Sequence, residues 1–392
     1  MARHATFARA YCGHLFDAKN PGQLWDVYVS CRFQEEQCFT DRFVLVKVKP
    51  EDKPVALHYE EKTPPPAFIA DLVAEANGKA DAVAWDQIRA VAPWKEALNG
   101  KNTASSPELK IAFDSKYLYL RYAEKNSIHT PGKDFWNNCT EIFLYGDALY
   151  PLLQIGIAPD GQALCNTYDI RKSSNDTADQ VTSEKTVCPG VFQGKTDGNT
   201  RTWEAALPLD KLPVFRKGAL HVNFYRTYPN GNPALAWSPV YEESYRNALN
   251  RFGTIYPGRM VLSGDQILCK QRTPEGIAFM DGNHGWEITA RPPKGLDPSA
   301  AYRISAELRC DAPPVEGKFM TRAGAYDEKT KKITGYVGID VSRIRGETFH
   351  RIPFDKPVKL TEDTFLYVGG FIPTKVHQGN VYLKSFILEK AE

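Results

Sequence analysis

Apolar and polar residues alternate along most of this chain with the period of two that is typical of β-strands. The clearest runs are 109–113 with 117–122, joined by a turn at 114–116, and 152–157 with 163–166, joined by Asp160-Gly161. An Asp-Gly pair between two such runs is a strong signal for a β-hairpin. Many short strands with turn signals between them predict an all-β fold, built from antiparallel, jelly-roll-like β-sandwiches in tandem.

Changes in composition along the chain divide it into four parts. Residues 1–50 form a β-rich segment, and residues 51–66 form a linker with prolines at 54, 64, 65 and 66. Such a Pro-rich stretch favours an extended chain. We expect one sandwich over 67–262 and a second over 263–392, where strand patterns continue to the end of the sequence.

A weak internal repeat connects the two ends of the chain. Residues 25–32 match 302–309 in length and pattern, since each opens on an aromatic residue and closes on arginine. Residues 43–47 match 386–390 in the same way. The first segment could therefore be a remnant of a preceding sandwich, although any two β-strands can share such patterns.

Composition and charge restrict the partners. The chain has 392 residues, 42% of them apolar, and a net charge of +2. This charge gives no broad basic field, so we expect neither nucleic acid nor a membrane as a partner. No signal-peptide pattern is visible at the N-terminus, and localisation stays open: extracellular or periplasmic if the chain is a piece of a longer exported protein.

Five short elements follow one another between residues 77 and 260. They are the opening Gly78, Asp81 and Trp85; the strand 136–144 with Trp136 and Glu141; 223–226 (Asn-Phe-Tyr-Arg); 236–239 around Trp237; and 251–255 (Arg-Phe-Gly-Thr-Ile). In this order they resemble the family 9 carbohydrate-binding module over about half the chain. The resemblance implies a β-sandwich that binds an oligosaccharide or polysaccharide without cleaving it, as an accessory module of a glycoside hydrolase-type protein.

The resemblance also implies where a sugar would bind. It places an aromatic clamp at Trp136 and Trp237, because the C–H face of a pyranose stacks on aromatic rings. The polar partners would be Glu141 and Arg226, with Asn223, Asn166 and Gln154 as further candidates. An alternative is that Glu141 and Arg226 form a buried pair that stabilises the fold. We expect Trp85, Trp94 and Trp203 to lie in the core.

Two other functions remain open at this stage. A glycoside hydrolase or lyase with its active site on a sandwich face would need two carboxylates, and Glu242-Glu243 is the most suggestive pair. Adjacent strand residues point to opposite faces, however, so these two could not easily flank one bond. The other alternative is a structural spacer without a ligand.

The sequence requires no cofactor, but two weaker features bear on ions and disulfides. Calcium as a structural ion is plausible at Asp169, Asp176 and Asp179, although a solvated loop would have the same composition. Among the eight cysteines, Cys31 and Cys38 could bridge neighbouring strands, or the thiols could simply be buried and free.

Overall fold

The computed structural model describes most of the chain. Side chains are described in the ranges 63–104, 106–125, 135–158, 160–170, 181–229, 233–241, 248–282, 285–314, 320–371 and 379–391, and the backbone also in 8–16, 24–34 and 37–48 and at residues 171, 180 and 372. The described residues are all-β, which confirms the predicted fold class. The only helices among them are single 3-10 turns: η1 Ala80–Ala82, η2 Phe135–Asn138, η3 Leu209–Lys211, η5 Leu249–Arg251, η6 Gly264–Gln266 and η7 Val341–Arg343. None of the helices in these ranges could cross a membrane, since all are far too short.

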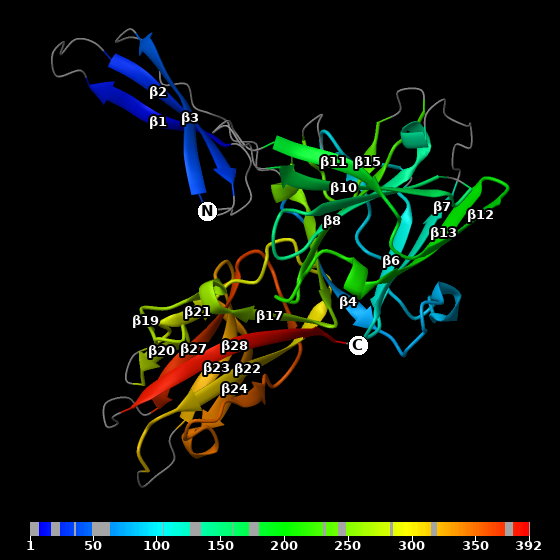
Figure 1. The fold of residues 1–392 in the computed structure, drawn as a ribbon. Coiled ribbons are helices and arrows are strands. Elements are labelled where there is room, and N and C mark those ends of the chain that lie inside the picture. Colours follow the sequence, from blue (N-terminus) through cyan, green and yellow to red (C-terminus); the bar gives the residue numbers. More distant parts are fainter. Residues whose placement is uncertain are drawn as a thin grey trace.

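The central domain is a sandwich made from one continuous curled sheet (Figure 1). Its strand order is β11-β10-β9-β8-β14-β16-β4-β6-β7-β13-β12, with β15 and β5 added beside β14. The bounds are β4 Ala67–Leu72, β5 Lys95–Glu96, β6 Glu108–Phe113, β7 Tyr117–Glu124, β8 Thr140–Tyr145, β9 Leu152–Ile157, β10 Ala163–Arg171, β11 Gln180–Thr186, β12 Val191–Asp197, β13 Thr200–Pro208, β14 Leu220–Arg226, β15 Leu235–Ala236 and β16 Gly253–Pro257. Both predicted hairpins are present, as β6–β7 and β9–β10.

The two halves of this sheet enclose one core. Apolar residues of β8, β9 and β14 pack against those of β6, β7 and β13 in a single cluster. Trp94 and Trp203 lie in it, each 1% exposed, and Trp85 is 4% exposed in a smaller cluster at one end of the sandwich. The prediction that these three tryptophans are core residues is confirmed.

The C-terminal domain is a second sandwich of two separate sheets. One sheet runs β19-β20-β28-β22-β25, with β17 and β26 beside it, and the other runs β18-β21-β27-β23-β24. The bounds are β17 Arg259–Ser263, β18 Ile267–Leu268, β19 Gln271–Arg272, β20 Ala278–Asp281, β21 Ile288–Ala290, β22 Ala301–Cys310, β23 Met320–Asp327, β24 Lys332–Asp340, β25 His350–Pro353, β26 Val358–Lys359, β27 Thr364–Ile372 and β28 Asn380–Lys390.

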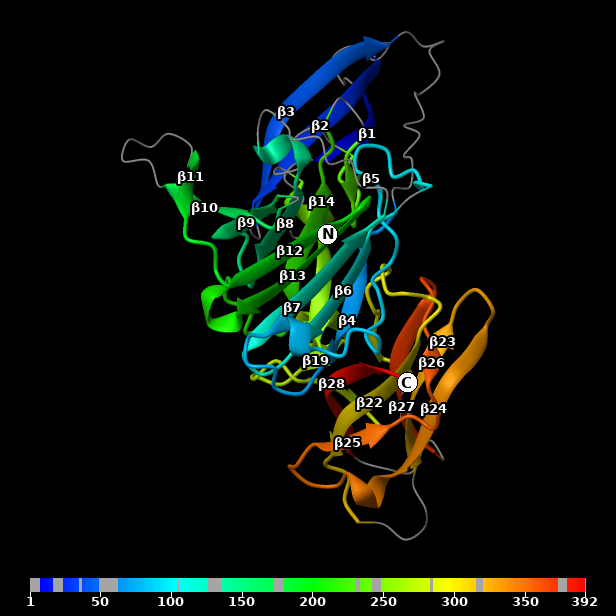
Figure 2. The same cartoon turned by 90° about the vertical axis from the view of Figure 1, so that its right-hand side faces the viewer.

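The chain passes from the first sandwich to the second at Gly258. β16 ends at residue 257 in the first sandwich, and β17 begins at residue 259 by pairing with β28 of the second. Gly258 has φ +67°, a conformation that costs glycine little. The domains touch closely, since Ala67 N donates to Gly295 O at 2.8 Å and Arg89 pairs with Asp297 at 2.5 Å. Figure 2 shows β4 beside this boundary.

The N-terminal strands β1 Ala8–Phe16, β2 Leu24–Gln34 and β3 Gln37–Val48 form a sheet of their own (Figure 1). In each copy of the weak repeat, the first segment pairs with the second: β2 with β3 at one end of the chain, and β22 with β28 at the other. The register of the two pairs is the same. Trp25 lies opposite Lys47, and Tyr302 lies opposite Lys390. Each pair of strands also has a register shift at the corresponding point, between residues 30 and 31 and between residues 307 and 308. Residues 51–62 of the expected linker lie outside the described ranges.

Candidate functional site

One face of the central sandwich brings together most of the candidate residues. The register of β8 with β9 places Glu141 opposite Gly156. In the next row, Phe143, Gln154 and Asn166 lie side by side on β8, β9 and β10. Alternate residues of these strands, such as Ile142 and Ile155, lie in the core. Because side chains alternate between the faces of a sheet, the candidates occupy the outer face.

A chain of hydrogen bonds fixes the polar side chains of this outer face. Gln154 Nε2 donates to Glu141 at 2.6 Å, while Gln154 Oε1 accepts from Asn166 Nδ2 at 3.1 Å and from the Tyr168 hydroxyl at 2.6 Å. Glu141 is fully buried and Gln154 is 4% exposed, but Asn166 is half-buried. The row therefore leads from a buried carboxylate to an amide at the surface.

Asn166 retains hydrogen-bonding capacity at this surface end. Its Nδ2 donates to Gln154, and its Oδ1 accepts no hydrogen bond from any residue of the described ranges. Since Gln154 is held from both sides, the Asn166 amide has one preferred orientation, with Oδ1 directed away from Gln154. The arrangement presents a fixed acceptor to an incoming hydroxyl group.

Trp136 lies beside this row. It belongs to η2, its carbonyl accepts a hydrogen bond from the Thr227 hydroxyl at 2.8 Å, and its ring is half-buried. The ring lies over Gly156, where an added Cβ would be 2.5 Å from a ring carbon of Trp136. Gly156 therefore provides the room that the indole occupies. Asn166 is a diagonal neighbour of Gly156 on the next strand, roughly 7–8 Å away.

Asn223 lies on the same face but is engaged in the fold. It is fully buried, its Nδ2 donates to Ser238 O at 2.7 Å, and its Oδ1 accepts from Ser238 N at 2.9 Å. Asn223 Nδ2 also lies 3.0 Å from the Tyr225 hydroxyl. These contacts extend the pairing of β14 with the chain that follows β15.

Trp237 lies away from Trp136, in the interior of the sandwich. It is 3% exposed, and its ring packs against Phe224 at 5.8 Å between centroids. The cause is strand alternation: Leu235 faces the core, Ala236 faces outward, and Trp237 faces the core again. The structure does not bring the two tryptophans together as the two sides of one clamp.

Arg226 also lies in the interior, and its partner is Glu124 and not Glu141. Arg226 pairs with Thr140 across β14 and β8, while Glu141 pairs with Tyr225, so Arg226 and Glu141 point to opposite faces. Arg226 Nε donates to Glu124 at 2.8 Å, and Arg226 is fully buried. The structure therefore does not form the buried pair of Glu141 with Arg226 that the sequence suggested; Arg226 pairs with Glu124 instead.

A cluster of buried polar residues surrounds this ion pair. Glu124 also accepts from the hydroxyls of Tyr122 at 3.0 Å and Tyr228 at 2.9 Å. Burial, assisted by the Glu124 carboxylate, raises the pKa of both tyrosines. A second guanidinium, Arg201, is fully buried nearby, and burial lowers its pKa. This cluster holds the two halves of the sandwich together.

The acidic candidates for calcium are not assembled into a site within the described residues. Asp169 Oδ1 accepts a hydrogen bond from the backbone N–H of Ile170 at 2.8 Å. Asp176, Asp179 and the Glu242-Glu243 pair lie outside the described ranges. No group of three or more His, Cys, Asp or Glu residues that could hold a metal ion occurs in the ranges described.

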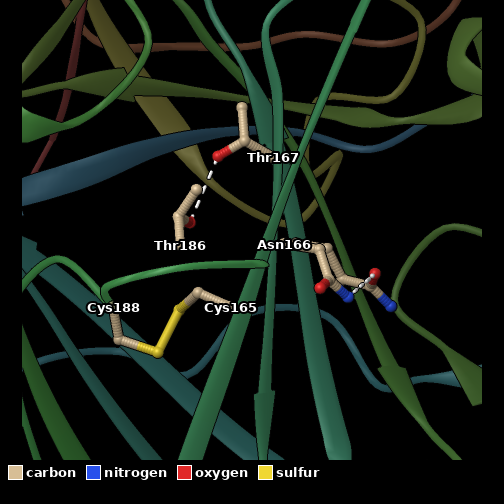
Figure 3. Close-up of a disulfide and its surroundings, with 6 residues drawn as sticks. Cys165, Asn166, Thr167, Thr186 and Cys188 are labelled. Carbon is tan, nitrogen blue, oxygen red and sulfur yellow. Dashed lines mark hydrogen bonds between the residues drawn. A yellow bond between two sulfur atoms is a disulfide. The ribbon is translucent and has the colours of Figure 1, made fainter. Parts of the chain in front are cut away.

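Sequence reasoning missed a disulfide on the core side of β10. Cys165 is bonded to Cys188, 23 residues further along the chain, whereas Asn166 projects from the opposite side of the strand (Figure 3). The sequence could have indicated this bond only through the register of the β10–β11 hairpin. That register places Cys165 opposite Thr186, two residues before Cys188. The side chains of Cys31 and Cys38 lie outside the described residues.

Tyr168 was also missed, and here the sequence did contain a signal. The predicted hairpin around Asp160-Gly161 fixes which residues of β9 and β10 share a face. Counting in steps of two from Asn166 reaches Tyr168, whose hydroxyl binds Gln154.

Comparisons with known proteins give distant structural similarities only. No family model and no curated protein matches the chain. Among solved structures, it is similar to a family 9 carbohydrate-binding module from Caldicellulosiruptor kristjanssonii in complex with glucose, with 13% identity and a TM-score of 0.35 over 48% of this chain and 94% of that one. It is also similar to a proposed carbohydrate-binding protein from Bacteroides uniformis, with 12% identity and a TM-score of 0.38 over 49% and 99%. The same module from C. kristjanssonii with cellotriose gives 12% identity and a TM-score of 0.33 over 49% and 92%.

Proposed function

We propose that the outer face of β8 to β10 binds a neutral glycan without cleaving it. The observation that carries the proposal is the half-buried ring of Trp136 beside a row of fixed polar groups that ends in Asn166. A pyranose needs both features, an aromatic surface for its C–H face and oriented polar groups for its hydroxyls. The family 9 module to which the chain is similar was solved in complex with glucose and with cellotriose, and both belong to this chemical class.

The burial of each residue suggests its role. Trp136 and Asn166 are accessible and would touch the sugar. Gln154 and Glu141 are buried and would act through Asn166, by holding its amide in one orientation. Trp237 and Arg226, which lie in the interior, would not contact the ligand.

The single carboxylate on this face favours a neutral ligand over an anionic one. It also favours binding of a glycan over its hydrolysis. Glu141 is the one carboxylate among the described outward-facing residues of β8, β9, β10 and β14. Glycoside hydrolysis commonly requires two carboxyl groups about 5–9.5 Å apart, flanking the scissile bond. A single buried carboxylate supplies a hydrogen-bond acceptor and disfavours an anionic sugar.

The test is calorimetric titration of the whole chain with neutral mono- and oligosaccharides, including glucose and cellotriose. We expect saturable binding that Trp136→Ala and Asn166→Ala each weaken by about tenfold or more, which corresponds to about 1.4 kcal/mol. The matched control is Trp237→Phe, which keeps an aromatic ring in the core and should leave affinity unchanged. Equal losses in the Trp136 and Trp237 variants would contradict the assignment, and so would the absence of binding by the folded wild type.

A further inference from the structure

The C-terminal sandwich has an outer face whose composition differs from that of an ordinary solvated sheet. In β27 and β23, Leu366, Val368, Ala323 and Ala325 point into the core. The residues between them therefore point outward, and they are aromatic residues, glycines and one arginine: Phe365, Tyr367, Gly369, Arg322, Gly324 and Tyr326. β24 adds Tyr336, which is 37% exposed, and Gly338.

Cross-strand pairing places each large side chain opposite a glycine. Tyr367 and Tyr336 lie on either side of Gly324, and Arg322 lies between Gly369 and Gly338. A Cβ added at Gly324 would be 2.7 Å from the Tyr367 hydroxyl oxygen, and one added at Gly369 would be 2.5 Å from Arg322 Nε. The glycines on these two strands thus provide the space in which the two polar groups lie.

Neither of these polar groups has a partner among the residues that the structure describes. The Tyr367 hydroxyl and Arg322 Nε are buried and make no hydrogen bond, and within the ranges described Arg322 forms no ion pair. Burial raises the pKa of Tyr367, so its hydroxyl keeps its proton at neutral pH. A buried donor without an acceptor is rare and destabilising in a native protein, and it calls for a specific explanation.

Aromatic rings form a wall next to the two donors. The ring of Trp286 stacks on Tyr367 with centroids 4.5 Å apart and an angle of 24°, and it contacts Tyr326 edge-on at 5.2 Å. Trp286 is half-buried and has φ +43°, a left-handed conformation that is strained for a residue with a large side chain. The backbone is held in an unfavourable conformation that keeps this indole against the sheet.

We propose that this face is a second binding site, for a carboxylate-bearing pyranose such as a uronic acid residue of an acidic polysaccharide. The carboxylate would bind the guanidinium of Arg322, a residue that is half-buried as a whole, since arginine is suited to paired contacts with carboxylates. A hydroxyl or ring oxygen would accept from Tyr367. The apolar face of the sugar would pack on the exposed aromatic surface, to which Tyr336 and Trp286 contribute.

This second site does not depend on the neutral-glycan site, because it lies on another domain and has the opposite charge preference. Arg322 supplies a positive charge that no carboxylate of the described residues compensates, whereas the first face contains Glu141. The two sites can therefore be tested separately, with different ligands and different variants.

The experiment is titration of the whole chain with trigalacturonic acid, and with galactotriose as the neutral control, at low ionic strength. We expect saturable binding of the acidic trisaccharide, at least tenfold weaker binding of the neutral one, and an affinity for the acidic one that falls as salt is added. Arg322→Gln should weaken binding of the acid by about tenfold or more. The control is Arg351→Gln, which removes an exposed guanidinium that already pairs with Glu389 on the other sheet. Trp136→Ala should also leave this binding unchanged.

A second variant separates a ligand role from a structural one. Tyr367→Phe removes a hydroxyl that has no partner, so the melting temperature should stay the same or rise while affinity for trigalacturonic acid falls. A lower melting temperature would mean that the hydroxyl has a structural partner, and would overturn the proposal. So would equal binding of galactotriose, an Arg322→Gln variant that behaves like Arg351→Gln, or no binding of trigalacturonic acid by the folded chain.

Discussion

Replacing Glu124 by glutamine should strongly destabilise the central sandwich. Glu124 is 4% exposed and accepts hydrogen bonds from Arg226 Nε and from the hydroxyls of Tyr122 and Tyr228. Glutamine has the same size but no charge, so Arg226 would remain buried without its counter-ion. Removing one partner of a buried ion pair costs about 3–5 kcal/mol. For a domain of this size we expect the melting temperature to fall by roughly 10 °C.

The measurement is urea unfolding of the wild type, Glu124→Gln, Arg226→Met and the double variant. Because the two side chains contact each other directly, the double-mutant cycle should give a coupling energy of about 2 kcal/mol or more. The cycle of Arg226→Met with Glu141→Gln should be additive within about 0.5 kcal/mol, since these side chains lie on opposite faces of the sheet. Glu389→Gln is the control for an exposed pair and should cost less than about 1 kcal/mol.

Two results would refute this reasoning. One is a loss of less than about 1 kcal/mol for Glu124→Gln, which would place the pair in the same class as the exposed control. The other is stronger coupling of Arg226 to Glu141 than to Glu124, which would restore the pairing that the sequence first suggested.

Three further predictions concern pH, oxidation and the shape of the sugar site. Burial opposes the charge of Asp114, but a hydroxyl and three backbone N–H groups hydrogen-bond to it and hold its pKa below the ordinary value. Its contribution to stability should therefore be present above about pH 4 and lost below it, and urea unfolding against pH should show a shallower acid loss for Asp114→Asn. Reducing the Cys165–Cys188 bond should lower the free energy of unfolding by about 3 kcal/mol, measured by urea unfolding with and without reductant; an unchanged midpoint would contradict this. Gly156→Ala should displace the Trp136 ring and weaken neutral-glycan binding without unfolding the sandwich, as titration and circular dichroism would show; full affinity would mean that the ring is not in the site.

Local sequence patterns were enough to predict the strands and their hairpins. The pairs β6–β7 and β9–β10 were predicted because each is joined by a short turn, so that the pattern and the pairing lie within about fifteen residues. The all-β class followed from the same signals. The side-by-side arrangement of Gln154 and Asn166 is part of this local information, since both belong to one hairpin.

Contacts between distant parts of the chain decided the rest of the candidate site. Arg226 meets Glu124 across the sandwich, 102 residues earlier in the sequence, and no local pattern indicates which carboxylate a buried arginine will face. For Trp237, the family resemblance suggested a place in the aromatic clamp, and therefore exposure. Its burial follows from the pairing of β15 with β14, which continues the strand alternation through the tryptophan.

Unpartnered donors identify a candidate binding site only when they lie on an accessible face. Arg201 also has buried nitrogens without a hydrogen bond, Nε and Nη1, but it is fully buried between the two halves of the sandwich. Its charge is attracted by Glu124, which lies in the same cluster, so a structural role explains it. Arg322 differs as a residue: it is half-buried, lies on the outer face next to the exposed Tyr336, and has no carboxylate partner among the described residues. Mutation of Arg201 should therefore affect folding, whereas mutation of Arg322 should affect binding and leave stability nearly unchanged.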